Sequence, residues 1–234
     1  MARLKQHTKS KGTADDAHHR LTEIYRLLLA SYGPQHWWPA DAPFEVIVGT
    51  ILTQSAAWGN VEKAISNLKQ ARVMTPTSLR KFPLGKLAKL IYPSGYYNAK
   101  ALKLKSFVEH LEEAYQDSLE KLFSLDILQL RSELLNIHGI GPETADSIIL
   151  YAAHKPIFVI DAYTRRILTR LGLSPSGDNY PAFQALFMDN LPADEKLFNE
   201  YHALLVRHGK EVCKTSPICE KCCLKGYCIY PMKR

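Results

Sequence analysis

The chain has 234 residues, of which 46% are hydrophobic and 23% are charged, and its formal net charge is +7 at pH 7. This length allows one large domain or two small ones, and the composition is that of a soluble globular protein. No apolar run approaches a membrane-spanning length and the polar N-terminus lacks the apolar core of a signal peptide, so we expect a cytoplasmic protein in a reducing compartment. The positive charge is compatible with nucleic acid as a partner, although many basic proteins bind none.

Helical periodicity dominates the chain, and alternating strand patterns are scarce. Apolar residues recur at helical spacing in residues 18–33, 43–54, 60–71, 101–115 and 131–137. Turns rich in proline and glycine separate these stretches, and residues 1–15 have the polar composition of a flexible tail. We therefore predict an all-α protein of about ten short helices.

The three tryptophans fall close together in the chain, as Trp37, Trp38 and Trp58. Taken without further context, such a group is typical of an aromatic core between packed helices.

A glycine turn separates two apolar runs, the first ending at Ile137 and the second filling residues 148–150. This arrangement predicts a helical hairpin. Gly139 and Gly141 permit positive φ and a close approach of the backbone to a partner, and Pro142 suits the first position of a helix. The N–H groups at such a helix start can bind a DNA phosphate, or the glycines can serve the turn geometry alone.

Three polar residues follow this turn. Glu143 and Thr144 lie in the first helical turn, where Glu143 can simply complement the positive end of the helix. Asp161 follows the apolar tetrad "IFVI" and precedes another helical stretch, which is the position of an N-cap residue. A carboxylate fixed at the end of a buried segment, near a phosphate-binding hairpin, is also well placed to face a sugar.

The cysteines are concentrated near the C-terminus, with C-x5-C-x2-C-x5-C spacing formed by Cys213, Cys219, Cys222 and Cys228 and with Cys223 left over. In a reducing compartment this density indicates a metal. Zinc sites usually pair two C-x2-C knuckles, whereas this compact arrangement favours a [4Fe–4S] cluster with four thiolate ligands. Zinc stays as the alternative.

Several stretches together resemble the helix-hairpin-helix DNA glycosylase superfamily, the endonuclease III group. They include "TILTQSAAWGNVEKA", "LLNIHGIGPETADSIIL", "VIDAYTRRILTRLG" and "HALLVRHGKEVCKTSPICEKC", and they occur in the family's order over roughly residues 25–230. The match departs from the family in having five residues, rather than six, between the first two cysteines. That departure leaves open whether Cys222 or Cys223 is the ligand.

The resemblance implies a two-lobed fold. Residues 43–156 would form a six-helix barrel domain containing the hairpin, and residues 16–42 with 157–234 would form a second helical domain ending in the [4Fe–4S] loop. The implied partner is double-stranded DNA with a damaged base, bound by a monomer in the cytoplasm at the nucleoid.

The resemblance also assigns roles. Asp161 occupies the position of the family's catalytic aspartate, which stabilises the oxocarbenium ion on the sugar and orients or deprotonates water. Family members that also cut the backbone have a lysine at the position of Glu143. Because a carboxylate cannot form a Schiff base, we expect a monofunctional glycosylase without AP lyase activity.

"HWWP" followed by "FE" and "LTQ" resembles the 3-methyladenine DNA glycosylase III branch, which also has glutamate at position 143. The base pocket implied by this likeness consists of Trp37, Trp38, Pro39, Trp58 and Glu143. Stacking on indole rings would select purines made cationic by methylation, such as 3-methyladenine and 7-methylguanine.

The family pattern further places Gln54 in the gap left by a flipped base and Tyr96 as a wedge on the opposite strand. Gly139, Gly141, Thr144 and Arg165 are expected to contact DNA, and Lys100 is considered as a phosphate contact or a solvated charge. Two other functions stay open: a mismatch, deaminated-base or oxidised-pyrimidine glycosylase, and a non-catalytic DNA-binding iron–sulfur protein.

Overall fold

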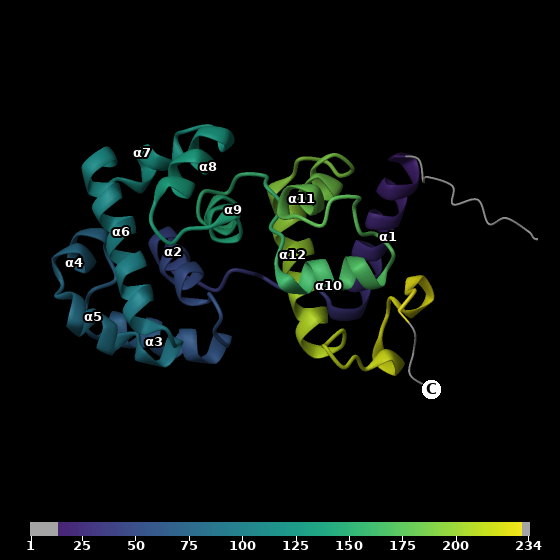
Figure 1. The fold of residues 1–234 in the computed structure, drawn as a ribbon, viewed down its shortest axis with the longest axis horizontal. Coiled ribbons are helices and arrows are strands. Elements are labelled where there is room, and N and C mark those ends of the chain that lie inside the picture. The colour runs from purple at the N-terminus through teal and green to yellow at the C-terminus, as the bar shows by residue number, and fades with distance from the viewer. Residues whose placement is uncertain (1–13, 231–234) are drawn as a thin grey trace, which may run out of the picture. The chain divides into compact units, whose positions relative to one another are not determined.

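The computed structural model describes residues 14–230, and these residues form twelve α-helices, three short 3-10 helices and no strand (Figure 1). The all-α prediction is therefore confirmed. The predicted N-terminal tail, residues 1–15, lies almost entirely outside the described residues. The α-helices are α1 Ala14–Tyr32, α2 Pro43–Leu52, α3 Trp58–Gln70, α4 Pro76–Lys81, α5 Leu84–Leu90, α6 Tyr97–Tyr115, α7 Leu119–Phe123, α8 Ile127–Asn136, α9 Pro142–Tyr151, α10 Ala162–Arg170, α11 Tyr180–Met188 and α12 Glu195–Glu211. The 3-10 helices are η1 Tyr92–Ser94, η2 Cys219–Lys221 and η3 Lys225–Tyr227.

The chain divides into two compact units. The first, here called the aromatic unit, consists of Gln35–Asp161 and Ala193–Ala203. The second, here called the cysteine unit, consists of the described residues up to Pro34, Ala162–Pro192 and the described residues from Leu204 onward. Each unit has its own core.

Helix α2 is the centre of the aromatic unit, because every residue from Phe44 to Leu52 is buried. A helix that is buried on all sides must be surrounded, and α2 packs against α3, α6 and α9. Pro43 occupies the first turn, where its missing N–H removes no helical hydrogen bond.

Lys100 stabilises the C-terminal end of α2. It is 2% exposed, and its ammonium donates hydrogen bonds to the carbonyls of Leu52 at 2.8 Å and Ser94 at 2.7 Å. Burial lowers the pKa of Lys100 to about 8. The prediction of a phosphate contact or a solvated charge at Lys100 is wrong, because this cation completes the carbonyl end of a buried helix.

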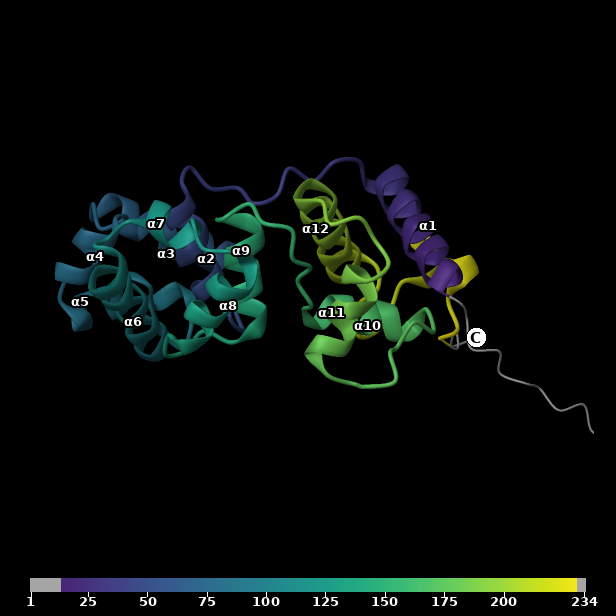
Figure 2. The same ribbon diagram turned by 90° about the horizontal axis from the view of Figure 1, so that it is seen from above.

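Helices α8 and α9 form the predicted hairpin and lie side by side in both ribbon views (Figures 1 and 2). Asp126 caps α8 by accepting a hydrogen bond from the Gln129 N–H at 2.9 Å. The two helices are tied by an ion pair of 2.7 Å between Arg131 Nε and the fully buried Asp146 Oδ1. The hairpin is therefore held rigidly behind its turn.

Helices α1, α10 and α11 and the C-terminal part of α12 build the cysteine unit. Its core includes Leu21 and Leu28 of α1 and Phe183 and Phe187 of α11. Gly209 lets α12 approach α10, since a Cβ atom there would lie 2.6 Å from Cδ1 of Tyr163. The loop after α12 packs onto this framework.

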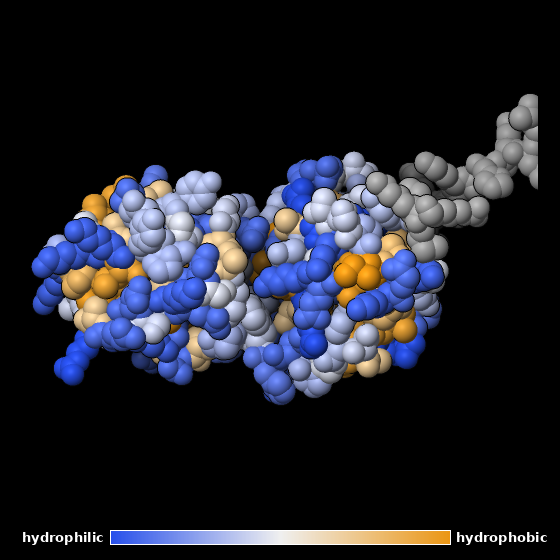
Figure 3. Space-filling view, turned by 90° about the horizontal axis from the view of Figure 1, so that it is seen from below, coloured by the Kyte–Doolittle hydropathy of each residue, from blue (hydrophilic) through white to orange (hydrophobic). Residues whose placement is uncertain are grey.

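The hydrophobic side chains on the face shown in Figure 3 form small patches separated by hydrophilic residues. Among the described residues, no helix combines the length and apolar character of a membrane span.

Candidate functional site

The three tryptophans form one cluster in the aromatic unit. The ring centroids of Trp37 and Trp58 are 5.3 Å apart, and those of Trp38 and Trp58 are also 5.3 Å apart. The planes are inclined by 54° and 84° respectively. Such edge-packed rings touch one another, so no base fits between them as they stand.

Trp38 is fixed by the packing around it. A Cβ atom at Gly49 of α2 would lie 3.1 Å from Cζ2 of Trp38, so glycine allows the indole to rest directly on the helix backbone. The Trp38 ring also packs against Tyr151, with 5.5 Å between ring centroids. The buried Nε1 of Trp38 has no hydrogen-bond partner among the described residues.

Trp58 also lines an open pocket along α3, together with Pro39, Glu45, Glu62, Ile65, Ser66 and Lys69. Trp37, Trp38 and Glu143 are not among the lining residues. Of the predicted base-pocket residues, therefore, Pro39 and Trp58 face this space, while Trp37 and Trp38 pack against Trp58.

The polar part of this pocket is charged. Lys69 Nζ lies 2.7 Å from both Asp41 Oδ2 and Glu45 Oε1, and these hydrogen bonds raise the pKa of Lys69. Glu45 is buried and Glu62 is exposed. Two carboxylates and one ammonium line the pocket, so its formal charge is negative, in contrast to the positive charge of the whole chain. The sequence analysis missed these residues, although Trp58, Glu62, Ile65 and Lys69 recur on one helical face.

Asp161 ends the buried segment Ile157–Ile160, as expected, and immediately precedes α10. Its side chain is 12% exposed, and Oδ2 lies 3.9 Å from Nε2 of His202. His202 in turn is joined through Nδ1 to the Tyr151 hydroxyl at 2.5 Å. The sequence analysis did not identify His202 or Tyr151.

The turn of the hairpin carries several predicted DNA-binding residues. Gly139 has φ of 85°, and the stem of Lys103 covers it so closely that a Cβ atom would lie 2.3 Å from Cγ of that lysine. Gly141 is the N-cap residue of α9 and has open space beside it. Glu143, in the first turn of α9, is exposed.

Gln54 binds this turn in the structure. Its Nε2 donates to the Gly139 carbonyl at 3.2 Å and to Oγ1 of the buried Thr144 at 2.9 Å. Its Oε1 accepts a hydrogen bond of 2.5 Å from Lys103 Nζ. To enter a DNA duplex, the Gln54 side chain would have to exchange these contacts.

Two further predicted DNA contacts lie elsewhere. Tyr96 is 74% exposed and precedes α6 with a left-handed backbone conformation. Arg165, in the cysteine unit, stacks on Phe183 and lies 3.6 Å from Asp178. Arg165 is partly exposed, so both side chains are accessible to a partner at the surface.

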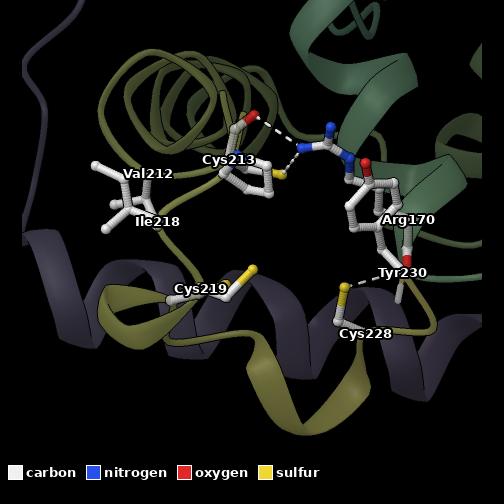
Figure 4. Close-up of a pocket in the computed structure, with 9 residues that line it drawn as sticks. Arg170, Val212, Cys213, Ile218, Cys219, Cys228 and Tyr230 are labelled. Carbon is white, nitrogen blue, oxygen red and sulfur yellow. Dashed lines mark hydrogen bonds between the residues drawn. The ribbon is translucent and has the colours of Figure 1, made fainter. Parts of the chain in front are cut away.

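In the cysteine unit, all four predicted ligands line one pocket: Cys213, Cys219, Cys222 and Cys228 (Figure 4). Cys223 does not line it, so the geometry favours Cys222. Nη1 of Arg170 lies 3.3 Å from Cys213 Sγ, and His208 Nε2 lies 3.5 Å from Cys222 Sγ. Burial raises the pKa of Cys222 to about 11.

The four thiols come from one loop and line the same pocket. Among residues 14–230, no three His, Cys, Asp or Glu side chains are close enough to hold a single metal ion. A [4Fe–4S] cube binds each thiolate to a different iron, so its ligands surround a space instead of meeting at a point. Arg170, 9% exposed, would offset the negative charge of the bound thiolates.

Known proteins share both the sequence and the fold. The HhH-GPD superfamily of base excision DNA repair proteins matches residues 48–193. A protein of Methanocaldococcus jannaschii, provisionally assigned as a DNA repair glycosylase, is 44% identical over 208 residues, which is 88% of this chain and 94% of that protein. Endonuclease III of Sulfolobus acidocaldarius is 32% identical over 189 residues, covering 80% of this chain and 82% of that protein.

Among solved structures, the 3-methyladenine DNA glycosylase MagIII of H. pylori, bound to 1,N6-ethenoadenine, has a TM-score of 0.70 and 28% identity, covering 83% of this chain and 97% of that chain. A non-covalent Endonuclease III–DNA complex has a TM-score of 0.77 and 23% identity, covering 93% of this chain and 96% of that chain. These likenesses confirm the predicted helix-hairpin-helix glycosylase fold. Since the family match spans most of the chain and relatives align along nearly all of it, this protein belongs to the HhH-GPD superfamily of base excision DNA repair proteins.

Proposed function

We propose that the protein is a monofunctional DNA glycosylase that flips alkylated purines of the 3-methyladenine and 7-methylguanine type out of double-stranded DNA and hydrolyses their glycosidic bond. The observation that carries the proposal is the pocket between Pro39 and Trp58, which has an aromatic wall and a negative formal charge. The 28% identity to the H. pylori 3-methyladenine DNA glycosylase supports it.

The pocket chemistry favours a cationic base. Methylation at N3 of adenine or N7 of guanine gives the purine a positive charge, and a cation on an indole face gains about 0.5–2 kcal/mol. Glu45 and Glu62 would add electrostatic attraction at the same pocket. Trp37 and Trp38 pack against the Trp58 ring, which would restrict its orientation when the base stacks.

The cationic purine is already a good leaving group, so the reaction needs little acid assistance. It needs a group that stabilises the sugar as the bond to the base breaks, and Asp161 is proposed for that role. Its carboxylate would lower the energy of the oxocarbenium ion and accept a proton from the attacking water. Because position 143 is an exposed carboxylate rather than a lysine, it offers no amine for a Schiff base.

The proposed DNA contacts lie around the hairpin and on exposed side chains. The N–H groups at the start of α9, beside the open Gly141, suit a phosphate. Gln54 is proposed to leave its bonds to Gly139 and Thr144 and fill the space of the flipped base. Tyr96 would act as the wedge on the opposite strand, and Arg165 would contact the backbone. The enzyme is proposed to act as a monomer at the nucleoid.

We propose that Cys213, Cys219, Cys222 and Cys228 hold a [4Fe–4S] cluster. When bound, the cluster would supply four iron–sulfur cross-links that organise the loop after α12. The residues proposed for bond cleavage all belong to the aromatic unit, so no reaction step is assigned to the cluster.

The test is a panel of lesion duplexes assayed for free base and for strand scission at stoichiometric enzyme. We expect release of 3-methyladenine and 7-methylguanine, intact strands before alkali treatment, and no covalent adduct after borohydride treatment of an abasic product. Release of thymine or uracil opposite guanine, or of thymine glycol, with no methylated purine released would instead indicate a mismatch or oxidised-base glycosylase. Absence of any base release together with tight DNA binding would indicate a non-catalytic DNA-binding protein.

A further inference from the structure

Two buried polar side chains connect the aromatic cluster to Asp161. Tyr151 ends α9 and is 3% exposed, and His202 lies in α12 and is 6% exposed. The Tyr151 hydroxyl and His202 Nδ1 are 2.5 Å apart, and His202 Nε2 faces Asp161 Oδ2 at 3.9 Å. The Tyr151 ring also packs against Trp38. The family resemblance assigns a role to Asp161 but none to the other two residues.

The neighbours of His202 determine which of its ring nitrogens carries a proton. A carboxylate can only accept hydrogen bonds, so a bare lone pair on Nε2 would be repelled by Asp161. Nε2 must therefore carry hydrogen. In the neutral ring Nδ1 is then an acceptor, and the Tyr151 hydroxyl donates to it. Burial raises the pKa of Tyr151 well above its ordinary value, which keeps this hydroxyl protonated.

The ring is held by apolar contacts as well as by Tyr151. Phe158, fully buried, meets the His202 ring edge-on at 6.3 Å between centroids. Two other carboxylates of α12 also lie near Tyr151, namely Glu195 and Glu200. Glu195 pairs with His154 at 3.4 Å, and Glu200 accepts the backbone N–H of Gln35 at 2.7 Å.

We propose that Tyr151, His202 and Asp161 form a relay in which Tyr151 and Asp161 together fix the tautomer of His202, and His202 in turn directs its Nε2–H group at the carboxylate of Asp161. His202 is thus a positioning residue for the excision reaction. A separation of 3.9 Å is an electrostatic contact that shortens to a hydrogen bond with a movement of about 1 Å, as catalytic hydrogen bonds commonly do when substrate binds.

The consequence for the reaction is specific. A donor on Oδ2 holds the Asp161 side chain in one orientation and leaves its other oxygen to face the sugar or the water. The proton released by water goes to the carboxylate, while His202 keeps its own proton. The catalytic role rests on the proposed function of Asp161, whereas the ring tautomer does not depend on it.

The tautomer can be measured without substrate. In the free protein, 15N chemical shifts of the His202 ring should show a protonated Nε2 and an unprotonated Nδ1 at neutral pH. In Tyr151→Phe the Nδ1 signal should move further from the protonated value, because the unprotonated nitrogen loses the hydrogen bond that it accepts. A wild-type ring protonated at Nδ1 alone would overturn the relay, whatever lesion the enzyme excises.

The positioning role can be measured by single-turnover excision of 7-methylguanine. His202→Phe should slow base release by about 10- to 100-fold, because misplacing a catalytic group by about 1 Å has effects of that size. Affinity for the lesion duplex should change less than about twofold, because the substitution disturbs the position of the Asp161 carboxylate and not the contacts with DNA. His202→Gln, which keeps an N–H donor, should recover most of the rate.

The matched control is His154→Gln, an exposed histidine of the same unit that pairs with Glu195 instead of Asp161. It should excise at the wild-type rate, and thermal melts should show that each variant is folded. Equal losses in His202→Gln and His202→Phe, or a wild-type rate in His202→Phe, would overturn the positioning role. A wild-type enzyme that releases no methylated base would refute the proposed function, while the ring tautomer would still decide the relay.

Discussion

In the cysteine unit, four thiols within residues 213–228 line one pocket. In the aromatic unit, Pro39 and Trp58 line the proposed base pocket, whereas Asp161 and His202 come from much later in the chain. The first site is built by one loop and its internal spacing. The second depends on the packing of several helices that are distant in sequence. We therefore expect substitutions in the cysteine loop to affect the bound metal, and substitutions in the base pocket to affect base excision.

The largest effect is expected at Asp161. Asp161→Asn should lower excision of methylated purines about 1,000-fold, because the amide is neutral and neither stabilises the cationic sugar nor accepts a proton from water. Asparagine caps a helix about as well as aspartate, so α10 should keep its start and the melting temperature should barely change. Single-turnover base release and thermal melts measure the two quantities. A folded variant with undiminished activity would leave Asp161 with a structural role only.

The next largest effect tests the thiol ligands of the proposed cluster. Cys222→Ser should abolish bound iron and acid-labile sulfide, because it removes one of the four thiols that line the pocket. Cys223→Ser is the matched control, since the neighbouring thiol does not line the pocket and its loss should leave the iron content unchanged. Iron and sulfide analysis with visible absorption measures both variants.

The same pair of variants distinguishes the metals. A tetrathiolate zinc site would give one zinc per chain and no sulfide, and would contradict the proposed cluster. Retention of iron in Cys222→Ser with loss in Cys223→Ser would reverse the ligand assignment.

The helices and the hairpin could be predicted from the sequence, because they depend on residues that are close together in the chain. Apolar periodicity predicted the helices, and the two glycines with Pro142 predicted the hairpin between α8 and α9. The choice between Cys222 and Cys223 is also a local one, and Cys222 is the thiol that lines the pocket. Such patterns are visible because helix spacing and turn chemistry act over a few residues.

Other features depend on contacts that no local pattern records. Lys100 resembles a surface cation in sequence, but its ammonium lies on the carbonyl end of α2. His202 meets Asp161 only because α12 returns to the aromatic unit. Gln54 was expected to be available for DNA, yet it binds the hairpin turn. Buried polar partners of this kind are set by tertiary packing, which a single sequence does not specify by spacing.

The smallest expected effect tests whether charge in the aromatic unit selects the substrate. Glu62 is exposed on α3 and lines the pocket with Trp58, so Glu62→Gln removes a charge without disturbing a buried ion pair. A partly solvated carboxylate a few ångströms from a cation contributes about 1 kcal/mol, which is about a fivefold effect. Excision of cationic 7-methylguanine should therefore fall about fivefold, while excision of neutral hypoxanthine or 1,N6-ethenoadenine should hardly change.

The ratio of the two rates is the informative quantity, because a general loss of folding or DNA affinity lowers both rates together. Glu113→Gln, an exposed position on α6 outside the pocket, makes the same change in net charge and should leave the ratio at the wild-type value. Raising the salt concentration should weaken DNA binding by all three proteins but should preserve the difference in ratio, since the charge acts at the short distance of a bound base. An unchanged ratio in Glu62→Gln would mean that Trp58 and Pro39 select the base by stacking and shape alone.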